Sequence, residues 1–106
     1  MTLNEAKTIV RDYVADTYTD SDILGWMQSL TDDLKANYSG DIIEGWSEPS
    51  STDTYVPSPW DYMYIHYSLY LYYLLQKDKQ SSDNHRTAYA VLLNDWAKYR
   101  RRNANV

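Results

Sequence analysis

The apolar residues of the N-terminal part recur every three or four positions, which is the spacing of one face of an α-helix. One set predicts a helix over about 3–15 and consists of Leu3, Ala6, Ile9, Val10, Tyr13 and Val14. Thr2 and Glu5 have the spacing of a capping box at its start. A second set predicts a helix that starts among the cap candidates at 18–21 and ends at Gly40. That set consists of Ile23, Leu24, Met27, Leu30 and Leu34.

The segment 41–58 follows neither the helix period nor the strand period, and it is rich in Pro, Ser, Thr and Asp from residue 48 onward. We expect a long loop here. A loop of this length in a small domain is usually functional or disordered, and the sequence leaves both alternatives open. Trp46 and Tyr55 indicate that part of the loop packs against other residues, and contact with a partner is one interpretation.

The most apolar stretch reads PWDYMYIHYSLYLYYLL at 59–75 and predicts a helix with Ser58 as N-cap and Pro59 in its first turn. Apolar residues occupy nearly every side of it, which is typical of a central buried helix. Tyrosine supplies most of the bulk, and each buried hydroxyl needs a hydrogen-bond partner. Since one small domain offers few such partners, we expect part of this surface to meet other subunits.

A last helix is predicted from near Ser82 to about residue 102, with the apolar positions Tyr89, Leu92, Leu93, Trp96 and Tyr99. The polar run at 76–82 joins it to the preceding helix as an antiparallel αα-hairpin. The predicted fold is therefore all-α: one domain over 1–106, made of four helices in two αα-hairpins, with a long loop between the second and third helices. A basic C-terminal tail covers about 99–106.

The net charge of −5 is unevenly distributed. Residues 1–53 hold three basic residues against eleven acidic ones, which gives −8, and residues 54–106 hold seven against four, which gives +3. This polarity suits head-to-tail contacts between copies, or docking of the basic end on an acidic partner. A solvated acidic surface with a basic tail explains the charges equally well. The acidic half disfavours tight DNA binding, because phosphates need Lys and Arg.

Few residues could carry chemistry. The chain has no cysteine, which excludes disulfides and thiolate sites. His66 and His85 lack the spacing of a helical metal motif, so a packed or hydrogen-bonded role is expected for each. We find no Walker loop, EF-hand or Gly-rich dinucleotide turn, and we predict no enzymatic activity, cofactor or metal. We also expect neither a signal peptide nor a membrane span, since the start lacks a long apolar run and the tyrosine-rich helix is short and interrupted by polar residues.

Three segments together carry a resemblance to a known family: YTDSDILGWM at 18–27, PWDYMYIHYSLYLYYL at 59–74 and AYAVLLNDWAKYRRR at 88–102. The chain resembles the small head–tail connector (adaptor, or head-completion) proteins of long-tailed bacteriophages. The residues that match are Trp60, Asp61 and Tyr64 at the start of the third helix, and Tyr89, Asn94, Trp96, Tyr99 and Arg100 in the last one. The likeness is specific over about 59–102 and departs from the family at 82–86.

The resemblance implies an all-helical subunit of a homo-oligomeric ring, commonly of twelve copies, beneath the portal protein at the neck of the virion. Such a ring is assembled in the host cytoplasm, continues the channel that DNA crosses without specific binding, and supports the next connector or tail-completion protein. The acidic N-terminal half, or the 41–57 loop, would line the channel or make ring contacts.

Three groups of candidate residues follow. The portal-docking group is Tyr99, Arg100, Arg101 and Arg102; the subunit or partner interface group is Trp46, Tyr55, Tyr62 and Tyr73; the core group is Trp60, Tyr64, Tyr67, Leu71, Leu92 and Trp96. Other interpretations stay open. The arginine run could be a C-cap and solubilising tail or a nucleic-acid contact. The chain could also be a small helical DNA-binding or regulatory phage protein, or another neck component such as a tail terminator.

Overall fold

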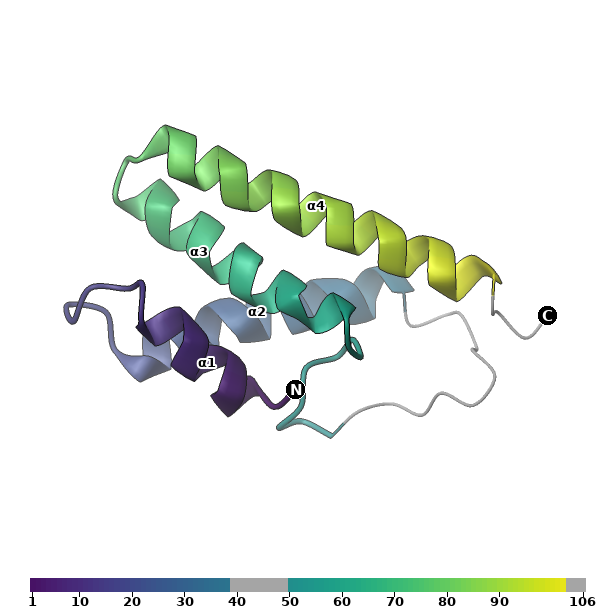
Figure 1. The fold of residues 1–106 in the computed structure, drawn as a ribbon. Helices are drawn as coiled ribbons and strands as arrows, with labels where there is room; N and C mark the ends of the chain where they lie inside the picture. Colours follow the sequence, from purple (N-terminus) through teal and green to yellow (C-terminus); the bar gives the residue numbers. More distant parts are fainter. Residues whose placement is uncertain (39–49, 103–106) are drawn as a thin grey trace.

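The computed structural model describes residues 1–38 and 50–102, and within these ranges the fold is all-helical, as predicted (Figure 1). Four α-helices are present there: α1 (Leu3–Arg11), α2 (Asp20–Tyr38), α3 (Met63–Leu75) and α4 (Lys79–Arg102). A 3₁₀ turn, η1 (Trp60–Tyr62), precedes α3. Among the same residues the β-type pairing is limited to one isolated bridge between Thr2 and Asp53.

Helix α1 begins as predicted but ends early. Both hydrogen bonds of the Thr2–Glu5 capping box are formed. The helix stops at Arg11, whereas the sequence predicted an end near residue 15. The reason is that the Arg11 guanidinium donates to the carbonyl oxygens of Ala15 at 3.0 Å and Tyr18 at 2.6 Å, so the chain folds around this side chain. Val14 still reaches the core.

Helix α2 starts at the predicted cap. The Thr19 hydroxyl accepts from the Asp22 N–H, and the Asp22 carboxylate accepts from the Thr19 N–H, a reciprocal arrangement like that of a capping box. Four of the five predicted stripe residues are buried, namely Ile23, Met27, Leu30 and Leu34, while Leu24 is half-buried. The predicted helix end at Gly40 lies outside the described residues.

The predicted start of α3 is wrong. Ser58 does not cap a helix that begins at Pro59. The Ser58–Pro59 peptide is cis, η1 follows, and α3 begins at Met63. The cause is local competition: the Ser58 hydroxyl donates to the Asp61 carboxylate at 2.9 Å instead of accepting from the helix backbone.

The turn between α3 and α4 is shorter than predicted. Helix α3 ends at Leu75, and α4 begins at Lys79 instead of near Ser82. Lys77 adopts a φ of 58°, in the left-handed region that reverses a chain within a few residues. Asp78 then caps α4, because its carboxylate accepts from the Ser81 N–H.

Helix α3 is the centre of the structure, in agreement with the prediction of a central buried helix. It contacts α1, α2 and α4. Figure 1 shows α4 along one side of α3, with α1 and α2 on the other. The buried residues of α3 are Met63, Tyr64, Ile65, Ser68, Leu69 and Tyr72.

Candidate assembly and docking surfaces

The basic end of α4 divides into buried and exposed parts. Arg100 is 1 % exposed. Its guanidinium donates to the Tyr38 carbonyl and lies over two rings, 5.3 Å from that of Tyr38 and 4.9 Å from that of Trp96. Arg101 and Arg102 are exposed. The prediction of Arg100 as a docking residue is therefore corrected: it joins α4 to the end of α2.

Tyr99 has a partly structural position. Its ring lies 4.6 Å from that of Trp60, so the last turns of α4 are held against η1. Tyr99 remains 37 % exposed. Of the four predicted docking residues, Tyr99, Arg101 and Arg102 therefore offer surface to a partner.

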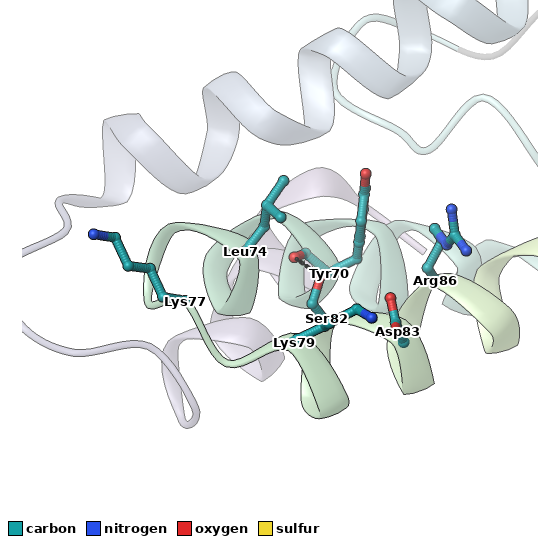
Figure 2. A pocket seen from close by; sticks show the side chains of 7 residues that line it. All are labelled: Tyr70, Leu74, Lys77, Lys79, Ser82, Asp83 and Arg86. Atoms are coloured by element: carbon teal, nitrogen blue, oxygen red, sulfur yellow. Dashed lines mark hydrogen bonds between the residues drawn. The ribbon is translucent and has the colours of Figure 1, made fainter.

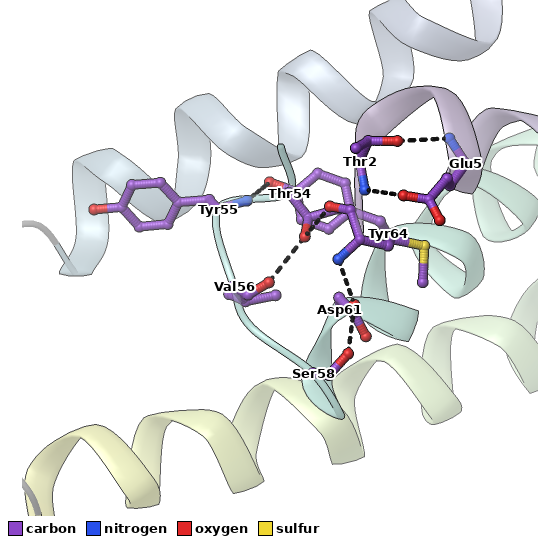
Figure 3. A network of polar contacts seen from close by, with 9 residues as sticks. Thr2, Glu5, Thr54, Tyr55, Val56, Ser58, Asp61 and Tyr64 are labelled. Carbon is purple, nitrogen blue, oxygen red and sulfur yellow. Dashed lines mark hydrogen bonds and ion pairs between the residues drawn. The ribbon is translucent and has the colours of Figure 1, made fainter. Parts of the chain in front are cut away.

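A polar network explains two of the residues that carry the family resemblance (Figure 3). The Asp61 carboxylate, 1 % exposed, accepts from the α-amino group of Met1 at 2.8 Å as well as from Ser58. The Tyr64 hydroxyl is hydrogen bonded to the Thr31 hydroxyl and accepts from the Tyr55 N–H. Asp61 and Tyr64 thus bind the N-terminus and the 50–58 segment to the start of α3.

The structure separates the four predicted interface residues. Tyr55 is 3 % exposed and packs on Trp96 with ring centroids 6.4 Å apart, so its assignment to an interface is corrected to the core. Tyr62 is 51 % exposed. Tyr73 is half-buried against His85. Trp46 lies outside the described residues.

The predicted core residues lie at two depths. Tyr64 and Trp96 are fully buried. Trp60, Tyr67 and Leu92 are partly buried and pack against the core cluster. Leu71 is half-buried.

The expectation that the tyrosine hydroxyls exceed the partners available in one chain is wrong for the described residues. No buried phenol oxygen there lacks a hydrogen-bond partner. Tyr64 is satisfied internally, and other tyrosines of α3 extend toward the surface, as Tyr67, Tyr70 and Tyr73 do. Burial changes the acidity of these phenols: it raises the pKa of Tyr89 to about 12, and it also raises the pKa of Tyr64.

A pocket of about 470 Å³ lies beside the α3–α4 turn (Figure 2). Its residues are Tyr70, Leu74, Lys77, Lys79, Ser82, Asp83 and Arg86. Leu74 is 53 % exposed, and the pocket is lined by three cationic side chains and one carboxylate. This pocket is toward the opposite end of α4 from Arg101 and Arg102, roughly 23–35 Å away along the helix at 1.5 Å per residue. The sequence did not predict this pocket, since its lysines fall within the predicted turn at 76–82.

The two histidines of the chain meet although they come from different helices. His66 Nδ1 of α3 and His85 Nδ1 of α4 are 3.0 Å apart. Partial burial lowers the pKa of both, and the proximity of His85 lowers that of His66 further. The spacing of residues along one helix could not predict this pair. The similar distance of the two histidines from the α3–α4 turn is a signal that could have predicted it.

The N-terminal half keeps its few cations engaged. Lys7 and Arg11 both pair with Asp20, at 3.4 Å and 3.1 Å. Asp12, Asp16, Asp22, Asp32 and Asp33 are exposed. Nothing in this half presents an unpaired basic helix of the kind that a DNA-binding helix-turn-helix needs, as far as residues 1–38 are concerned.

Two further findings bear on the type of site. In the parts of the chain that the structure describes, no cluster of three or more His, Cys, Asp or Glu could hold a metal ion. A lipid bilayer could not be crossed by any helix in these ranges, because none combines the necessary length and hydropathy. No family model, no curated protein and no solved structure matches the chain.

Proposed function

We propose that this chain is a virion structural protein, a head–tail connector subunit of a long-tailed bacteriophage. Copies form a ring of twelve that docks beneath the portal protein, extends the DNA channel and supports the next connector or the tail-completion protein. The neck of the virion is its location. In this proposal each subunit of the ring consists of two αα-hairpins, α1 with α2 and α3 with α4.

The observation that carries this proposal is the set of large apolar side chains left at the surface. Among the described residues, five of the six most exposed ones belong to the η1, α3 and α4 region: Tyr62, Leu74, Leu75, Val91 and Tyr99. The same region carries the family resemblance. Apolar and aromatic side chains of this size are enriched where protein surfaces meet.

The distribution of charge determines how the proposed subunit is oriented in the ring. The exposed Arg101 and Arg102 at the end of α4 dock, with Tyr99, on an acidic surface of the portal. The exposed aspartates of α2 and of the turn before it face the channel. DNA phosphates gain nothing from an acidic wall, because it offers no cations that replace their counterions.

Charge reversal tests the docking end. We expect the double substitution Arg101→Glu/Arg102→Glu to weaken binding to the portal protein of the same phage, measured by sedimentation or surface plasmon resonance at low salt. The matched control is Lys77→Glu/Lys79→Glu, which changes the charge equally at the other end of α4. Equal losses in both variants would mean that net charge, and not this end, governs binding.

A different partner distinguishes the alternatives. A tail terminator would bind tail-tube protein instead of portal, and a DNA-binding protein would retard duplex DNA at physiological ionic strength. We expect neither.

A further inference from the structure

The contact between His66 and His85 brings two metal-ligand atoms to one point between α3 and α4. The Nδ1 atoms are 3.0 Å apart, and the ring centroids are 5.3 Å apart at an interplanar angle of 31°. Both rings are only partly buried, so solvent reaches them. The Tyr73 ring stacks on His85 at 5.5 Å and 6° and restricts the orientation of that imidazole.

This separation lets both nitrogens bind one metal ion only after the rings turn. The 5.3 Å between centroids is the N–N distance plus the two centroid-to-nitrogen distances, so each Nδ1 now points at the other nitrogen. Each ring must turn by about 40° to direct its lone pair at a shared ion. Metal–imidazole bonds are about 2.0–2.1 Å long, so two nitrogens 3.0 Å apart subtend an angle of about 95° at a shared ion. An angle near 90° belongs to neighbouring positions of a tetragonal or octahedral site, such as Cu²⁺ or Ni²⁺ occupies. A tetrahedral zinc ion would need the nitrogens about 3.4 Å apart, so the rings would have to separate as well as turn.

We propose that His66 and His85 together bind one divalent transition-metal ion of the Cu²⁺ or Ni²⁺ class, through their Nδ1 atoms, and that the ion clamps α3 to α4. Water completes the coordination, since the described residues supply no third His, Cys, Asp or Glu to the group. This inference does not rest on the proposed function.

Metal binding requires a change of tautomer in one imidazole but no net release of a proton. In the metal-free pair of neutral rings one Nδ1 carries the hydrogen that the other accepts. When the ion binds, that proton moves through solvent to Nε2 of the same ring. Both rings then offer an Nδ1 lone pair to the ion and remain neutral.

Binding should stabilise the folded chain, because the two ligand atoms are brought together only when α3 and α4 pack. Titration of tag-free protein with CuSO₄ or NiCl₂, followed by calorimetry and by the melting temperature, measures this directly. We expect one ion per chain and a rise in melting temperature, with no effect of MgCl₂. Electron paramagnetic resonance of the Cu²⁺ complex should show two coordinated imidazole nitrogens.

Single substitutions separate a shared site from independent ones. His66→Gln and His85→Gln should each abolish the binding heat and the thermal shift as completely as the double variant does. Asn84→Gln, beside His85 on α4, should retain both. His85→Asn serves as a second variant if His85→Gln proves unfolded by circular dichroism.

Three results would overturn the proposal. Metal binding could survive in the double variant, or each single variant could retain half of the binding. The third is a ratio of one ion to two chains in the titration, together with a dimer mass in light scattering.

Discussion

At the scale of single residues, the most instructive case is an arginine. Three consecutive arginines at the end of a helix predict a solvated tail, yet Arg100 is buried between the rings of Tyr38 and Trp96. A signal was present, because Arg100 follows Trp96 by four residues and so lies on the same face of α4. Fully buried arginines are rare, so this spacing alone does not predict burial.

Substitution of Arg100 tests this assignment. Arg100→Ala removes a charged hydrogen bond to Tyr38 and two cation–π contacts, so we expect a loss of about 2–4 kcal/mol in the free energy of unfolding. Arg101 is the next residue and is exposed, so Arg101→Ala should change the free energy of unfolding by less than about 0.5 kcal/mol. Urea unfolding followed by circular dichroism gives both values. Similar small effects in the two variants would show that Arg100 is a surface residue after all.

The histidine pair makes a prediction about pH. The folded pKa of each imidazole lies below its ordinary value of 6.5, so below that pH the unfolded chain binds more protons than the folded one. Stability contributed by the neutral pair is therefore complete above pH 6.5 and declines as the pH falls below it.

Melting curves between pH 5 and 8 in the presence of a chelator measure this decline. In the double variant His66→Gln/His85→Gln the slope below pH 6.5 should be smaller than in the parent chain. An unchanged slope would assign the pH dependence to the carboxylates.

At the scale of elements, helical spacing predicted the existence of all four helices but not all of their ends. Periodicity reports which face is buried, and that information was sufficient for α2, whereas it did not single out the buried face of α3, which is apolar all round. The ends depend on single side chains that choose between partners: Arg11 ends α1, Asp61 takes the Ser58 hydroxyl, and Asp78 caps α4. Sequence spacing alone does not decide such competition.

The two tryptophans predicted for the core should differ in their effect. Trp96 is 1 % exposed and touches α2 and the 50–58 segment, so Trp96→Ala should cost about 3–5 kcal/mol. Trp60 is only partly buried, and its ring contact is with Tyr99, so Trp60→Ala should cost clearly less. Chemical unfolding of both variants provides the comparison. Equal losses would contradict the depth that the structure gives to these residues.

The buried carboxylate at the start of α3 should also be sensitive. Asp61→Asn keeps the shape of the side chain but removes the charge that faces the Met1 amino group, so we expect a loss of about 1–3 kcal/mol. Asp95→Asn, exposed on α4, is the matched control and should be near neutral. Thermal unfolding at neutral pH measures both, and a neutral Asp61→Asn would remove this ion pair from the account.

At the scale of the whole molecule, the fold class follows from the sequence, whereas the surfaces do not. The tyrosines of α3 suggested a chain that needs neighbours to satisfy its hydroxyls, but the described part of the chain satisfies its buried ones. The case for assembly now depends on exposed apolar side chains such as Leu74, Leu75 and Val91, and on two exposed arginines at the end of α4. A sequence pattern could not separate these from core positions, because α3 is apolar all round.

The mass of the complex between this chain and the portal protein of the same phage tests assembly most directly. Size-exclusion chromatography with multi-angle light scattering should give a portal ring enlarged by about one chain per portal subunit, and electron microscopy should show the added density as a closed ring. A portal whose mass stays unchanged when the chain is in excess, at low and at physiological salt, would contradict the proposed connector function.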